Sequence, residues 1–227
     1  MSIAALVVAA GSGKRLEQTL PKPFVLLKDK PILYWTLRVF ETCPLIHKIF
    51  LVVDADRIAQ TKSEIIFKYA FKKVQEIVAG GQERYHSVYN GLRALTDNIE
   101  WVAIHDCARP FLNQAILANA LEFAKKNGSA VLAVPVKDTI KEANEHMKVV
   151  LTCDRSRLFN IQTPQIFLRK EILKAYDQGL QRNHQMTDDA GMMEMAGYSV
   201  CLFPGDEKNI KITTPLDLKL AELFLEA

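Results

Sequence analysis

The sequence predicts an α/β fold, a three-layer sandwich in which helices cover both faces of a mostly parallel central sheet. Short runs that are apolar at every position alternate with longer segments of helical character, and such runs suit strands that are buried on both faces. The alternation stops after the run at 130–134. The segment 137–155 then has strand character around a polar turn, which predicts a β-arm that protrudes from the sandwich.

The first part of the chain supplies most of the expected sheet. The strands expected there are the buried runs at 3–9, 48–53, 74–78, 101–104 and 130–134. The helices expected between them lie at 31–40, 57–71, 83–95 and 114–126. Pro31 opens the first of these helices, and Asn127 and Gly128 end the last one. Glycine-containing turns are expected at 11–22 and at 80–81.

The second part departs from this alternation. Two runs of strand character within 137–152 flank the polar residues Asn144, Glu145 and His146, so a hairpin or extended arm is expected there. The remaining expected elements are helices at 169–181 and 188–196, a strand at 199–203 and a helix at 215–225. The sequence shows no linker, repeat or low-complexity segment, so residues 1–227 are expected to form a single domain with an arm at 137–155.

Bulk composition excludes several classes of protein. The 29 basic and 26 acidic residues give a formal charge of +3, a balance that does not indicate nucleic-acid binding. No apolar run approaches the length of a membrane span, so no membrane association is expected. The four cysteines are far apart in the sequence, which argues against a disulfide framework or a zinc site and favours a reducing, cytoplasmic location.

The loop after the first strand is a candidate phosphate site. Ligands bind beyond the carboxyl ends of the strands in an open parallel sheet. Small residues in this loop would let backbone N–H groups approach a phosphate, and Arg15 and Lys22 would add positive charge. A plain glycine turn with surface cations is the alternative. The P-loop pattern is missing, and Leu16 stands where a dinucleotide fingerprint needs its third glycine, which disfavours a nicotinamide oxidoreductase.

Polar residues after the fourth strand and in later loops extend the candidate site. Asp106 could hold a metal or a substrate hydroxyl, and Arg109 could bind a phosphate or form an ion pair with Asp106. His105 is interpreted as a packed histidine rather than a base. Further basic and hydroxyl residues could form an anion pocket, although each alone suits a surface position or a helix cap: Arg155, Thr163, Thr187 and Lys211.

A series of motifs, in order along the chain, resembles one enzyme family. The segment 6–15 (LVVAAGSGKR), followed by Pro21 and Lys22, is similar to the signature of sugar-phosphate nucleotidyltransferases. The later segments are 80–88 (GGQERYHSV), 105–110 (HDCARP), 135–139 (PVKDT), 163–165 (TPQ), 187–190 (TDDA) and 209–213 (NIKIT). The ordered set resembles the 2-C-methyl-D-erythritol 4-phosphate cytidylyltransferase family nearly end to end. That resemblance implies a Rossmann-like fold, CTP and a polyol phosphate as substrates, and a place in non-mevalonate isoprenoid synthesis.

The resemblance also implies roles for individual residues. The catalytic residues, which would contact the reacting phosphates, are Arg15, Lys22 and Lys211. The residues implied to bind CTP are Ala9, Ala10, Gly11, Gly13, Gly81, Gln82 and Ser87. The residues implied to bind the acceptor are Asp106, Arg109, Thr139, Arg155, Thr163 and Thr187. A divalent cation such as Mg²⁺ would be held mainly by the triphosphate, with Asp106 near it. The segment 137–155 would be exchanged between the subunits of a homodimer.

Two departures and three rival functions accompany this interpretation. Gln82 stands where the family often has Asp, which puts one ribose contact in doubt, and Cys107 stands where Ala is usual. The nearest rival is a cytidylyltransferase for ribitol 5-phosphate or another polyol phosphate. A non-catalytic nucleotide-binding module is disfavoured, because Arg15, Lys22 and Lys211 are all present. The third rival function is the nicotinamide oxidoreductase.

The nucleotide-transfer reaction would need no general base. A phosphate monoester with a second pKa of about 6 is already ionised near pH 7.

Overall fold

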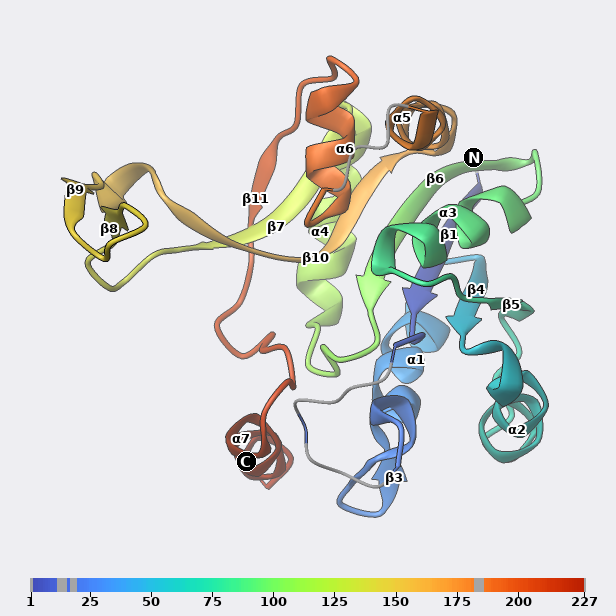
Figure 1. The fold of residues 1–227 in the computed structure, drawn as a ribbon. Coiled ribbons are helices and arrows are strands. Elements are labelled where there is room, and N and C mark those ends of the chain that lie inside the picture. Colours follow the sequence, from blue (N-terminus) through green and yellow to red (C-terminus); the bar gives the residue numbers. More distant parts are fainter. Residues whose placement is uncertain (1, 12–15, 17–19, 182–185, 227) are drawn as a thin grey trace.

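The computed structural model describes residues 2–11, 16, 20–181 and 186–226, and it confirms the predicted α/β fold (Figure 1). Within these residues, seven strands form one sheet in the order β11-β7-β10-β6-β1-β4-β5. The strands are β1 (Ser2–Val8), β4 (Lys48–Val53), β5 (Val74–Ala79), β6 (Ile99–Asp106), β7 (Ser129–Pro135), β10 (Phe159–Leu168) and β11 (Leu202–Pro204). Neighbouring strands are parallel except where β10 pairs with β6 and β7.

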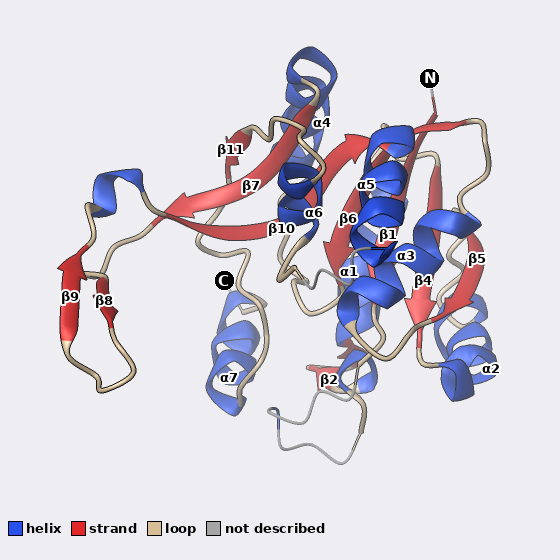
Figure 2. Cartoon of the chain, turned by 45° about the horizontal axis from the view of Figure 1, so that its top comes forward, coloured by secondary structure: helices blue, strands red, loops and turns tan. Residues whose placement is uncertain are grey.

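Alternate residues of the central strand β1 point into two separate apolar cores. Ile3 and Val7 lie in one core and Leu6 in the other, because successive side chains of a strand point to opposite faces. The first core is covered by α1 (Ile32–Thr42), α2 (Ile58–Thr61), α4 (Gln114–Asn127) and α7 (Pro215–Phe224). The second is covered by α3 (Arg84–Ala94), α5 (Arg169–Gln181) and α6 (Asp189–Met195). Figure 2 shows helices on both sides of the sheet, which is the predicted three-layer arrangement.

The helix boundaries follow local capping chemistry. Asn113 caps α4 by accepting hydrogen bonds from the backbone N–H groups of Ala115 (2.8 Å) and Ile116 (3.3 Å). Gly128 ends this helix in the left-handed conformation, with φ of 84°. The helix predicted at 57–71 is instead a short α2 that continues as a π-helix at Lys62–Phe67.

The longest strand of the sheet, β10, was not among the predicted elements. Its sequence is interrupted by Pro164, and proline is unfavourable within a central strand because it cannot donate a ladder hydrogen bond. The structure accommodates it in an irregularity, because the pairing with β7 shifts register between Ile161 and Gln165. The missed strand matters for function, since it places Thr163 and Gln165 beside β6.

The predicted arm is present as the hairpin β8 (Lys141–Ala143) and β9 (Val149–Thr152), which projects from the sheet on the ends of β7 and β10 (Figure 1). The carboxamide oxygen of Asn144 accepts hydrogen bonds from the backbone of His146 (3.1 Å) and Lys148 (3.0 Å) and so shapes the turn. The side chains of Val149 and Val150 are 61% and 62% exposed. The arm therefore carries apolar surface that this chain does not cover.

Several short elements connect the larger ones. A two-stranded ribbon, β2 (Leu26–Leu27) with β3 (Lys30–Pro31), precedes α1. Single 3-10 turns lie at Lys22–Phe24, Ala55–Arg57 and Arg155–Arg157. Among the described residues, no helix is long and apolar enough to cross a membrane.

Candidate functional site

Two loops at the carboxyl end of the sheet meet where the nucleotide is expected. The loop after β1 contains Ala10, and the loop after β5 contains Gly80, whose backbone N–H donates to the carbonyl of Val53 at 2.7 Å. A Cβ atom added to Gly80 would lie 2.4 Å from the Cβ of Ala10, so the two loops approach as closely as they do only because residue 80 is glycine. The structure thus brings together loops that are 70 residues apart in the sequence.

Backbone and hydroxyl groups fix the shape of these loops. The Ser87 hydroxyl accepts a hydrogen bond from the Gly81 backbone N–H at 3.0 Å and donates to the Glu83 carbonyl at 3.2 Å. Gly11 has a φ of 125°, which glycine adopts readily, and its N–H donates to the Asp54 carboxylate at 3.1 Å. Among the residues expected to bind CTP, Ala9 and Ser87 are buried and Ala10 is half-buried, whereas Gly11, Gly81 and Gln82 are exposed. Gly13 and Arg15 lie outside the described residues.

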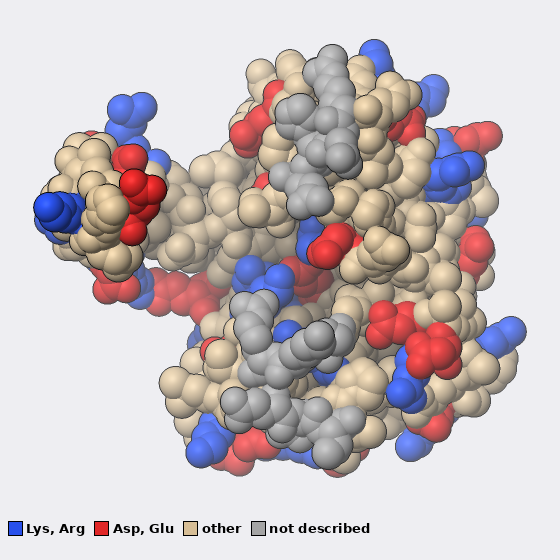
Figure 3. Space-filling view, viewed as in Figure 1, with Lys and Arg blue, Asp and Glu red and all other residues tan. Residues whose placement is uncertain are grey.

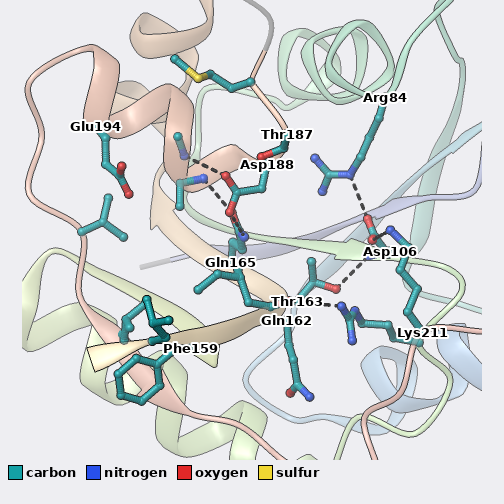
Figure 4. Close-up of a pocket in the computed structure, with 18 of the residues that line it drawn as sticks. Arg84, Asp106, Phe159, Gln162, Thr163, Gln165, Thr187, Asp188, Glu194 and Lys211 are labelled. Atoms are coloured by element: carbon teal, nitrogen blue, oxygen red, sulfur yellow. Dashed lines mark hydrogen bonds and ion pairs between the residues drawn. The ribbon is translucent and has the colours of Figure 1, made fainter. Parts of the chain in front are cut away.

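The central feature of the site is a carboxylate at the end of β6 that contacts two cations. One oxygen of Asp106, Oδ1, accepts a hydrogen bond from Nε of Arg84 at 3.0 Å. The other, Oδ2, lies 2.6 Å from Nζ of Lys211. Figure 4 shows Arg84 and Lys211 reaching Asp106 from opposite sides. The three side chains come from α3, β6 and the loop before α7, so the folded sheet assembles them from distant parts of the chain.

The electrostatics of this group keep the carboxylate ionised. Burial alone would raise the pKa of Asp106, but the charges of Arg84 and Lys211 outweigh burial and hold that pKa far below its usual range. Burial alone would lower the pKa of the Arg84 guanidinium, but the carboxylates of Asp189 and Asp106 raise it well above its usual value. The site therefore presents fixed charges rather than a group that exchanges protons near neutral pH.

His105 is a buried structural residue, as its sequence context indicated. Burial lowers its pKa to about 4, so the ring is neutral near pH 7. Its Nε2 lies 3.0 Å from the carbonyl of Arg109, and its Nδ1 lies 3.1 Å from the Thr163 hydroxyl. Because a carbonyl only accepts, Nε2 carries the proton, and Nδ1 accepts from Thr163. The same Thr163 oxygen accepts the backbone N–H of Asp106 at 3.1 Å.

A cavity of about 700 Å³ lies between β6, β10 and α6. Asp106, Arg109, Thr163, Thr187 and Lys211 all line it, so five of the residues predicted from separate motifs converge on one cavity. Figure 3 shows basic and acidic side chains together in the recess near the middle of this face. The mixture of charges suits a ligand that combines an anionic group with hydroxyls.

Arg109 and Thr187 lie in the cavity in different ways. The guanidinium of Arg109 donates to two backbone carbonyls, those of Asn209 at 2.8 Å and Ile161 at 3.3 Å, and makes no ion pair with Asp106. The alternative of a structural ion pair between Asp106 and Arg109 is thus replaced by the pair with Arg84. Thr187 is exposed and does not cap α6, because Asp188 is the capping residue and accepts the N–H of Gly191 at 3.0 Å.

Three further predicted residues lie elsewhere. Lys22 begins the 3-10 turn beside the end of β6, where its charge acts on the thiol of Cys107. Burial nevertheless raises the pKa of that thiol to about 12, which makes Cys107 inert near neutral pH. Thr139 and Arg155 are exposed in the arm, and Arg155 donates to the carbonyl of Lys137 at 2.8 Å. Within this chain, the arm residues do not line the cavity.

Sequence reasoning missed part of the site. Arg84 was present in a motif without an assigned role, and Asp189 was considered only as part of a helix start. In the structure the fork of Arg84 binds Asp189 at 2.9 and 2.8 Å. Gln165 connects β10 to α6, since its amide nitrogen donates to Asp188 at 2.9 Å and its oxygen accepts from Ala190 at 2.8 Å. The sequence offered one clue to Arg84: it stands at the first position of the helix that follows the Gly80–Gly81 turn. A side chain at that position points back toward the strand ends.

The described residues do not assemble a metal centre of their own. No cluster of three or more His, Cys, Asp or Glu side chains within the described part of the chain could hold a metal ion. The charge of Asp106, the carboxylate predicted to lie near the metal, is already balanced by Arg84 and Lys211. The residues present therefore suit a divalent cation only if the nucleotide phosphates supply most of its ligands.

Comparison with known proteins identifies the family. A family model described as 2-C-methyl-D-erythritol 4-phosphate cytidylyltransferase matches residues 3–227. A curated relative of that name from Alkaliphilus metalliredigens is 44% identical over 223 residues, which cover 98% of this chain and 92% of the relative. Another, from Clostridium botulinum, is 46% identical over 221 residues, which cover 97% of this chain and 96% of the relative.

Solved structures agree with the sequence relatives. A crystal structure of 4-diphosphocytidyl-2C-methyl-D-erythritol synthase from Anaerococcus prevotii matches with a TM-score of 0.89 and 32% identity, covering 100% of this chain and 96% of that chain. A Thermus thermophilus 2-C-methyl-D-erythritol 4-phosphate cytidylyltransferase matches with a TM-score of 0.82 and 28% identity, covering 100% of both chains. Together with the ordered motifs and the cavity in which they meet, these matches show that the chain belongs to the 2-C-methyl-D-erythritol 4-phosphate cytidylyltransferase family.

Proposed function

We propose that the protein joins CTP to 2-C-methyl-D-erythritol 4-phosphate, giving 4-diphosphocytidyl-2-C-methyl-D-erythritol and pyrophosphate in non-mevalonate isoprenoid synthesis. A phosphate oxygen of the acceptor attacks the α-phosphorus of CTP, the new P–O bond forms, and the bond to the pyrophosphate oxygen breaks. The observation that carries the proposal is the convergence of Asp106, Lys211 and Thr187 on one cavity. Asp106 pairs with Val8 at the end of β1, so the cavity adjoins the strand end that the first glycine loop follows.

The chain contributes charge and position rather than acid–base chemistry. The attacking phosphate is already ionised near pH 7, and His105, beside Asp106, is a neutral packed side chain with a pKa of about 4. The difficulty is to bring two polyanions together, and Lys211, which contacts Asp106, and Lys22, whose charge acts on the neighbouring Cys107, supply positive charge. Catalysis then follows from alignment and charge neutralisation.

We assign the two ends of the acceptor to different parts of the cavity. The phosphate lies toward Lys211 and Arg109, because these are cationic. Its hydroxyls lie toward Asp106, because an ionised carboxylate only accepts hydrogen bonds. A divalent cation such as Mg²⁺ would enter with CTP, since the described residues offer no cluster of three or more metal-ligating side chains, and it would neutralise charge on the triphosphate.

The proposal includes a homodimer formed by the arms and a cytoplasmic location. The exposed apolar side chains of β9 and the isolation of Thr139 and Arg155 from the cavity support exchange of the arm between subunits. Val150→Asp would place a charge in that contact, so sedimentation should show weakened association, whereas Lys148→Asp at the hairpin turn serves as a control. The four cysteines are free thiols, which suits a reducing compartment.

Pyrophosphate release tests the reaction directly. The purified protein is incubated with CTP, Mg²⁺ and either methylerythritol 4-phosphate or ribitol 5-phosphate. Release with methylerythritol phosphate alone supports the proposal. Release only with ribitol phosphate would keep the nucleotide chemistry and replace the acceptor. Absence of release with both, in a folded protein that binds CTP, would contradict a catalytic function.

A further inference from the structure

We propose that Arg84 is a positioning residue that holds Asp106 in place permanently, whereas Lys211 is an exchangeable partner that leaves Asp106 when the acceptor phosphate binds. The inference rests on the proposed function, because it concerns how that acceptor enters. In this scheme Asp106 has two cationic partners before the acceptor arrives and one afterwards. The oxygen that Lys211 releases then accepts a hydroxyl of the acceptor.

The first support is the way in which Arg84 is anchored. Its two terminal nitrogens make a forked pair with Asp189, at 2.9 and 2.8 Å, and its Nε remains for Asp106. Asp189 is fully buried and also accepts the hydroxyl of Tyr176 at 2.5 Å. Both members of this support lie behind the site, in α6 and α5. A planar fork held from behind in this way cannot turn toward a ligand without leaving a buried carboxylate unpaired.

The second support is the contrast with Lys211. Among the contacts of the described residues, its amine is paired with Asp106 and with no second carboxylate. Its side chain is 39% exposed, against 28% for Arg84, and it ends in a compact ammonium on a flexible four-carbon stem. A phosphate dianion that enters the cavity therefore competes with Asp106 for Lys211 and not for Arg84.

This division of roles predicts a specific defect when the anchor is weakened. Without the hydrogen bond from Nε of Arg84, the carboxylate of Asp106 depends on Lys211 alone for a cationic partner. Lys211 is then held more tightly and is less available to the acceptor phosphate. Binding of the acceptor should weaken, while binding of CTP, which uses the loops after β1 and β5, should not change.

The test compares Arg84→Lys with Arg93→Lys. The first keeps the charge but loses the fork, and the second makes the same change at the other end of α3, where Arg93 lies over the ring of Tyr89. Two readouts are used: the KM of each substrate from pyrophosphate release, and the binding of inorganic phosphate, read as protection of Lys211 from amine acylation by mass spectrometry. For Arg84→Lys we expect the acceptor KM and the phosphate dissociation constant to rise by about 10-fold or more, the scale of one lost hydrogen bond between charged groups. The CTP KM and all values for Arg93→Lys should stay at the wild-type level.

A second variant separates positioning from folding. Tyr176→Phe removes one bond to Asp189 from a residue that does not line the cavity, so it should raise the acceptor KM by less than Arg84→Lys and leave the CTP KM unchanged. Equal rises in both KM values, a lower kcat with an unchanged acceptor KM, or unchanged phosphate protection of Lys211 in Arg84→Lys would each overturn the inference. If the wild-type protein releases no pyrophosphate but phosphate protection shifts as expected, the proposed function fails and the anchoring role of Arg84 stands.

Discussion

Thr163 was predicted from the sequence to bind the acceptor, but in the structure its hydroxyl makes hydrogen bonds within the protein, to Asp106 and His105. Replacing this residue therefore tests whether the hydroxyl has a structural role. Thr163→Val preserves the shape of the side chain and removes the oxygen. Two groups then lose their partner, the backbone N–H of Asp106 and Nδ1 of His105, and both residues are buried. An unsatisfied buried polar group costs about 1–3 kcal/mol, so the unfolding free energy should fall by about 2–6 kcal/mol.

The assay is thermal unfolding at pH 7 together with acceptor kinetics. In a chain of this size each kcal/mol lowers Tm by about 2–4 °C, so a loss near the middle of the range, about 4 kcal/mol, corresponds to a fall of roughly 8–16 °C. Thr163→Ser, which restores the oxygen, should recover most of the loss. Thr139→Val, at an exposed position in the arm, should leave Tm unchanged. A Tm of Thr163→Val within about 1 °C of wild type, with only the acceptor KM raised, would refute the internal role of the hydroxyl.

Three further predictions concern other parts of the site. Acid should destabilise the protein between pH 6.5 and 4, because burial lowers the pKa of His105 from 6.5 to about 4 and the unfolded chain binds the proton that the folded chain excludes. The free energy of unfolding should fall by about 3 kcal/mol across this window. Urea unfolding at several pH values measures it, and an unchanged free energy of unfolding across the window would contradict the prediction. Lys22→Ala should lower kcat by about 100-fold with little change in the CTP KM. The control Lys30→Ala, in the nearby ribbon, should match wild type, and weaker CTP binding at unchanged kcat in Lys22→Ala would argue against a transition-state role. Gly80→Ala should force the loops after β1 and β5 apart, because its Cβ would lie 2.4 Å from that of Ala10, and should cost about 1–3 kcal/mol of stability. In steady-state kinetics it should raise the CTP KM more than the acceptor KM. Equal effects on both substrates would count against the assignment of these loops to CTP.

The elements that the sequence predicted well are those in which local pattern and burial agree. The strand at 48–53 is apolar from Ile49 to Val53 and is flanked by the charged residues Lys48 and Asp54, and its position was predicted to the residue. The start and end of α4 follow from Asn113 and Gly128, whose capping chemistry acts within one turn.

The element that the sequence did not predict is one in which tertiary contacts override local pattern. β10 contains polar residues and Pro164, and it becomes a central strand only because β6 and β7 provide partners on both sides. The same limit applies to the site. The motifs placed Asp106 and Lys211 in separate loops, but which cation each carboxylate contacts depends on Arg84 and Asp189, which meet only after α3 and α6 pack together.

The position of β10 also constrains how a nascent chain can assemble. β7 is synthesised before β10, yet its only neighbours in the sheet are β10 and β11. A chain that has left the ribosome up to residue 158 can therefore pair β5, β4, β1 and β6, but β7 has no strand to join. The loops after β1 and β5 can take shape during synthesis, whereas the cavity proposed for the acceptor must wait until β10 fills the gap and Lys211 has emerged, so the two halves of the site are completed at different times.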